Sequence, residues 1–107
     1  GVDVPNDREG VLQDSHWAGG SIGYFPSYAI GSAYGAQYLR QMQKDFNVSA
    51  AVATGRLTQI NRWLEEKIWK YGCMKDPTPL FESVCGPFDP TCYTAYLRDK
   101  FTEVYGL

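Results

Sequence analysis

The feature that most constrains this sequence is a run without any charged residue, from Ser15 to Leu39. A membrane-spanning helix needs about 20 predominantly apolar residues, so a run of this length must be tested against that possibility. Adjacent glycines at Gly19 and Gly20 interrupt the run, and Pro26 interrupts it again. Because glycine and proline break helices at such points, we expect no membrane span and predict that the run divides into two parts.

The first part is a loop and the second a helix. Residues 1–25 are expected to form a glycine-rich loop or a short extended piece, because glycines between positions 10 and 23 permit unusual backbone angles. A helix is predicted over residues 26–44, since Pro26 suits the first turn of a helix. Gly31 and Gly35 inside it suggest close packing against another backbone. One ridge at i, i+4 spacing carries Ile30, Tyr34, Tyr38 and Met42.

Further along the chain, the segment 56–71 gives the clearest helical pattern, and Gly72 follows it as a C-terminal cap. A short helix is also predicted at 48–54, ending before Gly55. The apolar stripe expected on the longer helix consists of Leu57, Ile60, Leu64, Ile68 and Tyr71.

Two more helices are predicted near the end of the sequence. The first covers residues 79–85, with Thr78 as its N-cap and Pro79 at its first position. The second covers residues 90–105, with Asp89 as cap and Tyr93, Leu97, Phe101 and Val104 as its stripe. No alternation of apolar and polar residues lasts long enough to predict a sheet, so the expected fold class is all-α.

Composition narrows the classes of function. The chain has 107 residues, 44% of them apolar and 21% charged, which is typical of one globular domain. A net charge of −2 without a basic cluster argues against nucleic-acid binding. The polar start shows no signal peptide, so we expect a cytoplasmic protein. The three cysteines, Cys73, Cys85 and Cys92, are then expected as free thiols, the alternative being a Cys85–Cys92 bridge.

One cluster of side chains suits catalysis. Histidine and tyrosine can both donate a hydrogen bond to a developing oxyanion, and a nearby carboxylate such as Asp14 can orient a histidine tautomer. The same residues also fit an ordinary packing role, so the pattern alone leaves both readings open. The candidates are Gln13, Asp14, His16, Trp17, Tyr24 and Tyr28.

A family resemblance favours the catalytic reading. The stretch GVLQDSHW fills every fixed position of the pattern Gly-x-x-Gln-Asp-x-His-Trp, and GYFPSY follows it. The chain thereby resembles the carboxypeptidase Taq family of zinc metallocarboxypeptidases, and the likeness extends through RWLEEKIWKYG to YLRDKFTEVYGL. The family's His-Glu-x-x-His zinc motif is absent from these 107 residues. The resemblance therefore implies the C-terminal helical segment of a larger, mostly helical zinc peptidase.

The resemblance also implies roles for the candidates. His16, with Tyr28 favoured over Tyr24, would stabilise the substrate's carbonyl oxygen. Gln13, Asp14 and Trp17 would shape the site, hold His16 and contact substrate. Zinc would be held by ligands outside this chain, so the segment alone is expected to be inactive. The expected partners are a peptide substrate, the remaining N-terminal part of the enzyme and a second copy in a homo-oligomer. The alternative is a non-catalytic helical packing or interaction module.

Overall fold

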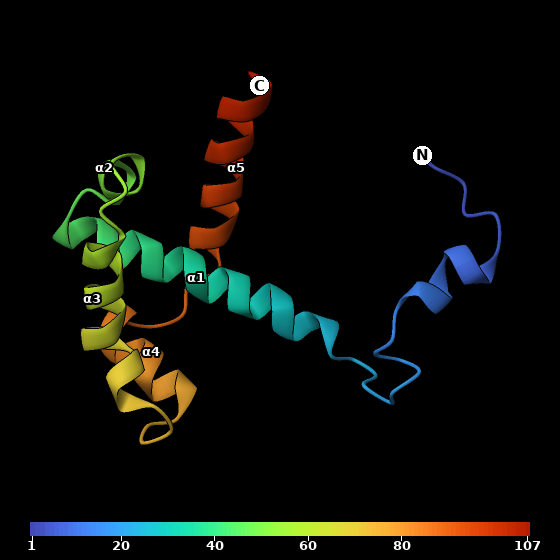
Figure 1. Cartoon of the computed structure of the whole chain (residues 1–107), viewed down its shortest axis with the longest axis horizontal. Coiled ribbons are helices and arrows are strands. Elements are labelled where there is room, and N and C mark those ends of the chain that lie inside the picture. Colours follow the sequence, from blue (N-terminus) through green and yellow to red (C-terminus); the bar gives the residue numbers. More distant parts are fainter. The chain divides into compact units, whose positions relative to one another are not determined.

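The computed structural model describes all 107 residues, which form helices and connecting loops without a strand (Figure 1). The expected all-α class is confirmed. The chain divides into two compact units, Gly1–Ile30 and Gly31–Leu107. The α-helices are α1 (Phe25–Asp45), α2 (Val48–Ala53), α3 (Leu57–Lys67), α4 (Pro77–Cys85) and α5 (Thr91–Tyr105), and short 3-10 helices cover Asp7–Glu9, Val11–Gln13 and Trp69–Tyr71.

The first unit is a loop that contains two single-turn 3-10 helices, Asp7–Glu9 and Val11–Gln13. The Asn6 side chain caps the first of them by accepting a hydrogen bond from the backbone N–H of Glu9 at 3.0 Å. Asparagine favours such positions because its short side chain reaches the free N–H groups of a helix start. The sequence pattern predicted the loop but not these two turns.

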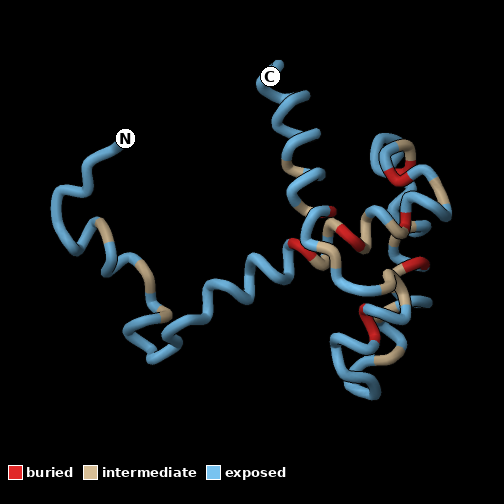
Figure 2. Tube along the Cα trace, turned by 180° about the vertical axis from the view of Figure 1, so that it is seen from behind, coloured by how far each residue is buried: buried red, intermediate tan, exposed pale blue.

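The second unit has a core centred on Met42, Val48 and Trp63, drawn red among the paler residues of Figure 2. The buried Trp63 indole donates a hydrogen bond to the Asp45 carboxylate at 2.6 Å, which satisfies its only polar atom. Trp63 lies outside the stripe predicted for this helix, whereas Leu57, placed in that stripe, is 52% exposed. The predicted stripe was therefore wrong at both positions.

Aromatic rings join α1 to α4. Phe81 is fully buried, and the ring of Tyr34 stacks on it with the centroids 4.1 Å apart. Tyr38 meets the same phenylalanine edge-on at 5.1 Å. The predicted ridge of α1 thus faces the core of the second unit through Tyr34, Tyr38 and Met42.

Two predicted helix limits need correction. Helix α4 begins at Pro77 with Asp76 as N-cap, so the predicted cap at Thr78 was wrong. Proline suits the first helical position, and the residue before a proline favours extended backbone, as Asp76 does with ψ 148°. The helix predicted over 56–71 breaks at Ile68, and a 3-10 turn follows.

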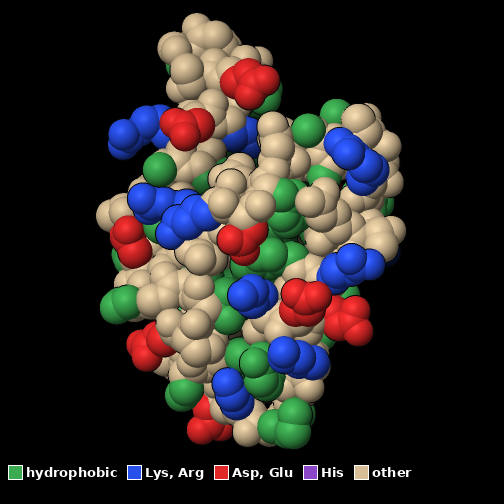
Figure 3. Space-filling model, turned by 90° about the vertical axis from the view of Figure 1, so that its left-hand side faces the viewer, with side chains coloured by type: hydrophobic (Ala, Val, Ile, Leu, Met, Phe, Trp, Pro, Cys, Tyr) green, Lys and Arg blue, Asp and Glu red, His purple; other side chains and the backbone are tan.

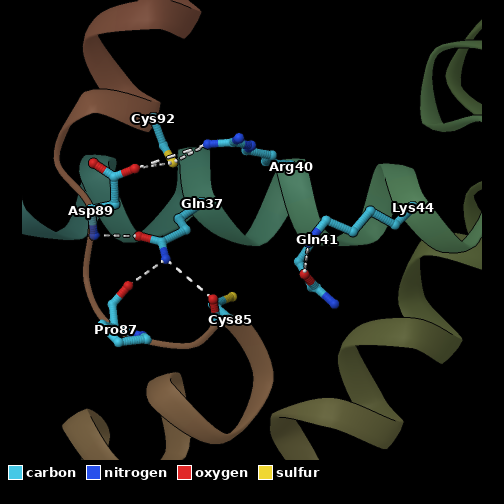
Figure 4. Close-up of a pocket in the computed structure, with 8 residues that line it drawn as sticks. All are labelled: Gln37, Arg40, Gln41, Lys44, Cys85, Pro87, Asp89 and Cys92. Carbon is cyan, nitrogen blue, oxygen red and sulfur yellow. Dashed lines mark hydrogen bonds and ion pairs between the residues drawn. The ribbon is translucent and has the colours of Figure 1, made fainter.

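A buried amide closes the loop between α4 and α5 (Figure 4). The Gln37 side chain, 6% exposed, donates hydrogen bonds from Nε2 to the carbonyl oxygens of Pro87 at 2.9 Å and Cys85 at 3.3 Å. Its Oε1 accepts from the backbone N–H of Asp89 at 2.8 Å. One side chain of α1 therefore satisfies three backbone groups of this loop.

Helix α5 begins directly after this loop. The N-cap of α5 is Pro90, so the predicted cap at Asp89 was one residue too early. The Asp89 carboxylate still accepts a hydrogen bond from the Thr91 backbone N–H at 2.9 Å. Beyond its first turns the helix is little covered: Phe101 is 42% exposed and Val104 63% exposed. The predicted stripe of α5 is thus only half-buried at Tyr93 and Leu97 and exposed further along.

The surface carries both signs of charge. On the face drawn in Figure 3, lysine and arginine side chains alternate with aspartates and glutamates over short distances.

The close packing expected at Gly31 and Gly35 of α1 is not found in this chain. A Cβ added at either glycine would meet no atom within 4 Å. No helix combines the length and the apolar character needed to cross a membrane.

Candidate active site

Asp14 organises the turn that carries the histidine. Its Oδ2 accepts hydrogen bonds from the backbone N–H groups of His16 at 3.1 Å and Trp17 at 3.3 Å. Aspartate commonly closes turns in this way, by bonding backbone groups a few residues ahead. The turn leaves the second carboxylate oxygen, Oδ1, free to meet a side chain.

The side chain that Oδ1 meets is His16. Its Nδ1 lies 2.8 Å from Asp14 Oδ1, and its Nε2 lies 3.2 Å from the hydroxyl of Tyr28. The side chains of His16 and Asp14 are 32% and 27% exposed, so both are sheltered but within reach of solvent. The hydrogen bond from His16 lowers the pKa of the Asp14 carboxyl, and the backbone N–H of Trp17 lowers it further.

Aromatic rings surround the imidazole. Tyr24 stacks on His16 with the centroids 5.5 Å apart and the planes inclined by 17°. Phe25 meets the imidazole edge-on at 5.3 Å. Tyr28 and Tyr24 meet each other edge-on at 5.2 Å. Together, the three aromatic residues limit how far the imidazole can turn.

The structure brings together four of the six predicted site residues: Asp14, His16, Tyr24 and Tyr28. Trp17 borders them, since its ring is half exposed and lies 6.1 Å from that of Phe25. The two tyrosines differ, because the hydroxyl of Tyr28 bonds the histidine whereas Tyr24 contributes its ring face.

Gln13 points elsewhere. Its side-chain amide donates a hydrogen bond to the backbone carbonyl of Arg8 at 2.6 Å, which ties it to the preceding 3-10 turn. Its observed contact is therefore structural, within the turn that leads to Asp14.

Sequence reasoning missed Phe25 as a member of the cluster. Phe25 is the first residue of α1, and Tyr28 follows three residues later. Residues three apart lie on the same face of a helix. The helix predicted from Pro26 left Phe25 outside, and a start one residue earlier would have placed Phe25 beside Tyr28.

The 107 residues offer no site for a metal ion. No three His, Cys, Asp or Glu side chains come together. The chain has a single histidine, and its one carboxylate partner, Asp14, already holds three hydrogen bonds. A tetrahedral zinc site requires at least three protein ligands, so the residues present do not fit a metal.

A separate cavity of about 220 Å³ lies in the second unit, beside Gln37 (Figure 4). At its edge, Arg40 donates a hydrogen bond to the sulfur of Cys92 at 3.1 Å and lies 3.9 Å from the carboxylate of Asp89. All three cysteines are free thiols, and burial raises the pKa of Cys85 to about 11. The Cys85–Cys92 alternative is thus not the observed state. Of the charged side chains that line the cavity, Arg40 and Asp89 are paired with each other, and Lys44 donates a hydrogen bond to the Gln41 side chain at 2.8 Å.

Comparison with known proteins identifies the family. The sequence model of the carboxypeptidase Taq (M32) metallopeptidases matches residues 1–101. The chain belongs to the carboxypeptidase Taq family. The family match includes the whole first unit. It therefore includes His16 and the residues that contact it, which are Asp14, Tyr24, Phe25 and Tyr28.

Three individual carboxypeptidases are also similar to the chain. The chain is 38% identical over 107 residues to carboxypeptidase 1 of Bacillus subtilis and 38% identical over 95 residues to thermostable carboxypeptidase 1 of Pyrococcus furiosus. It is 33% identical over 108 residues to thermostable carboxypeptidase 1 of Thermus thermophilus. These alignments cover 98%, 87% and 99% of this chain, but only 21%, 19% and 21% of the relatives. The chain thus spans about a fifth of their length.

Proposed function

We propose that these residues are the C-terminal part of a longer metallocarboxypeptidase that removes C-terminal amino acids from peptides. Family membership and the carboxypeptidase names of three relatives support this proposal. The relatives are about five times as long as the region they share with this chain. The metal of such an enzyme, which we take to be zinc, would be held by ligands outside these 107 residues, and the segment alone would be inactive.

The part assigned to this chain is stabilisation of the substrate's carbonyl oxygen. Negative charge grows on that oxygen while a peptide bond is hydrolysed, and hydrogen-bond donors fixed beforehand lower the energy of the transition state. Donors fixed by the protein cost little reorganisation when the charge appears. His16 and Tyr28 are the proposed pair, with Tyr24 and Trp17 forming the surrounding wall.

The observation that carries this proposal is the hydrogen-bonded chain from Asp14 through His16 to Tyr28. The His16 side chain is 32% exposed, so water could satisfy both ring nitrogens, and two side-chain partners therefore favour more than a space-filling role. Tyr28 is 55% exposed, so a substrate can reach this residue from solvent. Fixed polar groups within reach of solvent are what a substrate-binding surface requires.

The test is turnover of a peptide substrate by the complete polypeptide that carries this segment. His16→Ala and Tyr28→Phe are each expected to lower kcat by about 100- to 1000-fold, the usual cost of losing one oxyanion donor. Metal content should stay at the wild-type level in both variants. Tyr105→Phe is the matched control, since that tyrosine is 69% exposed on α5 and should keep full activity. Wild-type turnover in Tyr28→Phe, or loss of metal in His16→Ala, would contradict the proposal.

An interaction role is the second candidate, and the exposed apolar side chains favour it. Ile30, Val52, Tyr96 and Phe101 are each at least 40% exposed. The remaining part of the enzyme, or a second copy in a homo-oligomer, would cover such residues. Sedimentation of the 107-residue chain at rising concentration tests this, because a monomer at every concentration would argue against self-association.

A further inference from the structure

The hydrogen bonds around His16 determine where its proton lies. A neutral imidazole carries one N–H, and an ionised carboxylate can only accept. The 2.8 Å contact between Nδ1 and Asp14 Oδ1 therefore requires the proton on Nδ1. Nε2 is left with a lone pair, so in its 3.2 Å contact the hydroxyl of Tyr28 must be the donor.

This arrangement rests on the proposed function and narrows it, because only Tyr28 of the proposed pair is left as a donor to the substrate oxygen. We propose that Asp14 is a positioning residue that keeps the proton of His16 on Nδ1, so that the Tyr28 hydroxyl, and not the imidazole, donates to the substrate oxygen. The neutral imidazole has no second N–H to offer, because its only one is bonded to Asp14. His16 then acts through Tyr28, and Tyr28 is the residue that touches substrate.

The two oxygens of Asp14 have different tasks, and both are needed. Oδ2 accepts two backbone N–H bonds, which fixes the plane of the carboxylate. Oδ1 is thereby aimed at the imidazole. The stacked ring of Tyr24 and the edge of Phe25 oppose a flip of the imidazole that would exchange its nitrogens.

The hydroxyl of Tyr28 remains able to turn. Rotation about its Cζ–Oη bond moves the proton from Nε2 of His16 toward an incoming oxygen without moving any ring. As charge grows on that oxygen it becomes the stronger acceptor, because hydrogen bonds to ionised groups are roughly twice as strong as neutral ones. The site therefore holds a donor that is in place before the substrate arrives.

Nitrogen NMR of the 107-residue chain tests the position of the proton, because His16 is its only histidine and yields unmixed signals. We expect a protonated, pyrrole-type Nδ1 and a bare, pyridine-type Nε2 at pH 9. In Asp14→Asn the side-chain carbonyl should keep the two backbone bonds, which turns the amide NH₂ toward Nδ1. The proton should then move to Nε2. Asp7→Asn, the same change in the same unit away from His16, should leave the signals unaltered.

Three results would overturn the positioning role of Asp14: a bare Nδ1 in the wild type, a ring protonated on both nitrogens, or an unchanged spectrum in Asp14→Asn. If the loop is unfolded in solution, His16 will give the spectrum of an unstructured histidine, in which the proton lies mainly on Nε2. That outcome counts as the first of these results. These readouts do not involve turnover, so they can fail while the proposed function survives, and the reverse.

Kinetics of the complete polypeptide tests the assignment of Tyr28 as the donor. If His16 acts through Tyr28, then His16→Ala should lower kcat by about 100-fold alone but by less than about 3-fold when Tyr28 is already phenylalanine. If His16 touches the substrate itself, the two losses will multiply, and the assignment of Tyr28 as the donor is refuted.

Discussion

Replacing Gln37 by leucine should destabilise the second unit far more than an ordinary surface change. Leucine has nearly the same volume, so the substitution leaves little cavity. The substitution removes the three hydrogen bonds that the Gln37 amide makes to the backbone. These join it to the carbonyl oxygens of Cys85 and Pro87 and to the N–H of Asp89. The effect therefore measures hydrogen bonding rather than packing.

The magnitude follows from those three bonds. A typical intramolecular hydrogen bond contributes about 0.5–1.5 kcal/mol net, and a buried group left unpaired costs about 1–3 kcal/mol. Pro87 is exposed and Asp89 half-buried, so water can replace part of what is lost. We expect about 2 kcal/mol of lost stability.

Urea unfolding of the 107-residue chain, followed by circular dichroism, measures this loss. With a slope of roughly 1–1.5 kcal/mol per molar urea, the midpoint should fall by about 1–2 M. Gln43→Leu is the matched control, because Gln43 lies on the same helix, is exposed, and should change stability by less than about 0.5 kcal/mol. Equal midpoints for the two variants would refute the argument that Gln37 anchors the loop.

Three other predictions concern titration, thiol chemistry and metal. Because the His16 hydrogen bond lowers the pKa of Asp14, the stabilising contact is complete above the ordinary value of 3.8 and is lost only as pH falls through the lower folded value. Carboxyl carbon NMR should show this lowered pKa, and a smaller lowering in His16→Ala, which keeps the backbone N–H bonds to Asp14. At pH 8 an aromatic disulfide reagent should modify the exposed Cys73 well before Cys85, whose pKa of about 11 leaves roughly 0.1% thiolate. Calorimetry with zinc should detect no tight one-to-one binding to the 107-residue chain, and such an isotherm would overturn our view that the ligands lie elsewhere.

The start of a helix was predictable from the sequence only where a single proline marked it. Pro26 is a single strong signal, and α1 begins beside it. The stretch DPTPL offers two proline starts in succession, and the pattern gives no reason to choose between Pro77 and Pro79. Helix α4 begins at the first of them, Pro77. The residue before it, Asp76, has extended backbone and serves as the N-cap.

Spacing predicted only part of the burial on α3: Ile60 and Leu64 pack against the core, but Leu57 is 52% exposed. The stripe predicted over 56–71, which consists of Leu57, Ile60, Leu64, Ile68 and Tyr71, omits Trp63, although Trp63 is buried. The partner that makes Trp63 a core residue is Asp45, eighteen positions earlier. A contact between distant segments leaves no trace in local periodicity.

The candidate site shows the same division. The motif and its spacing placed Asp14, His16 and Tyr28 in one short span, but spacing alone says nothing about which atoms meet. That His16 has two partners, and that Gln13 turns back to Arg8, follows from the backbone course of the turn. The sequence could identify the participants but not their hydrogen-bond directions.

The way α5 is held has a mechanical consequence. Its fifteen residues extend about 22 Å, yet its firm attachment is at the end next to the Gln37 amide. A tilt of about 10° at that attachment would move the far end by about 4 Å, given that length. A small change at this attachment thus becomes a larger displacement at the other end of the helix. The positions of Phe101 and Tyr105 therefore depend on the Gln37 side chain, which bonds the loop before α5.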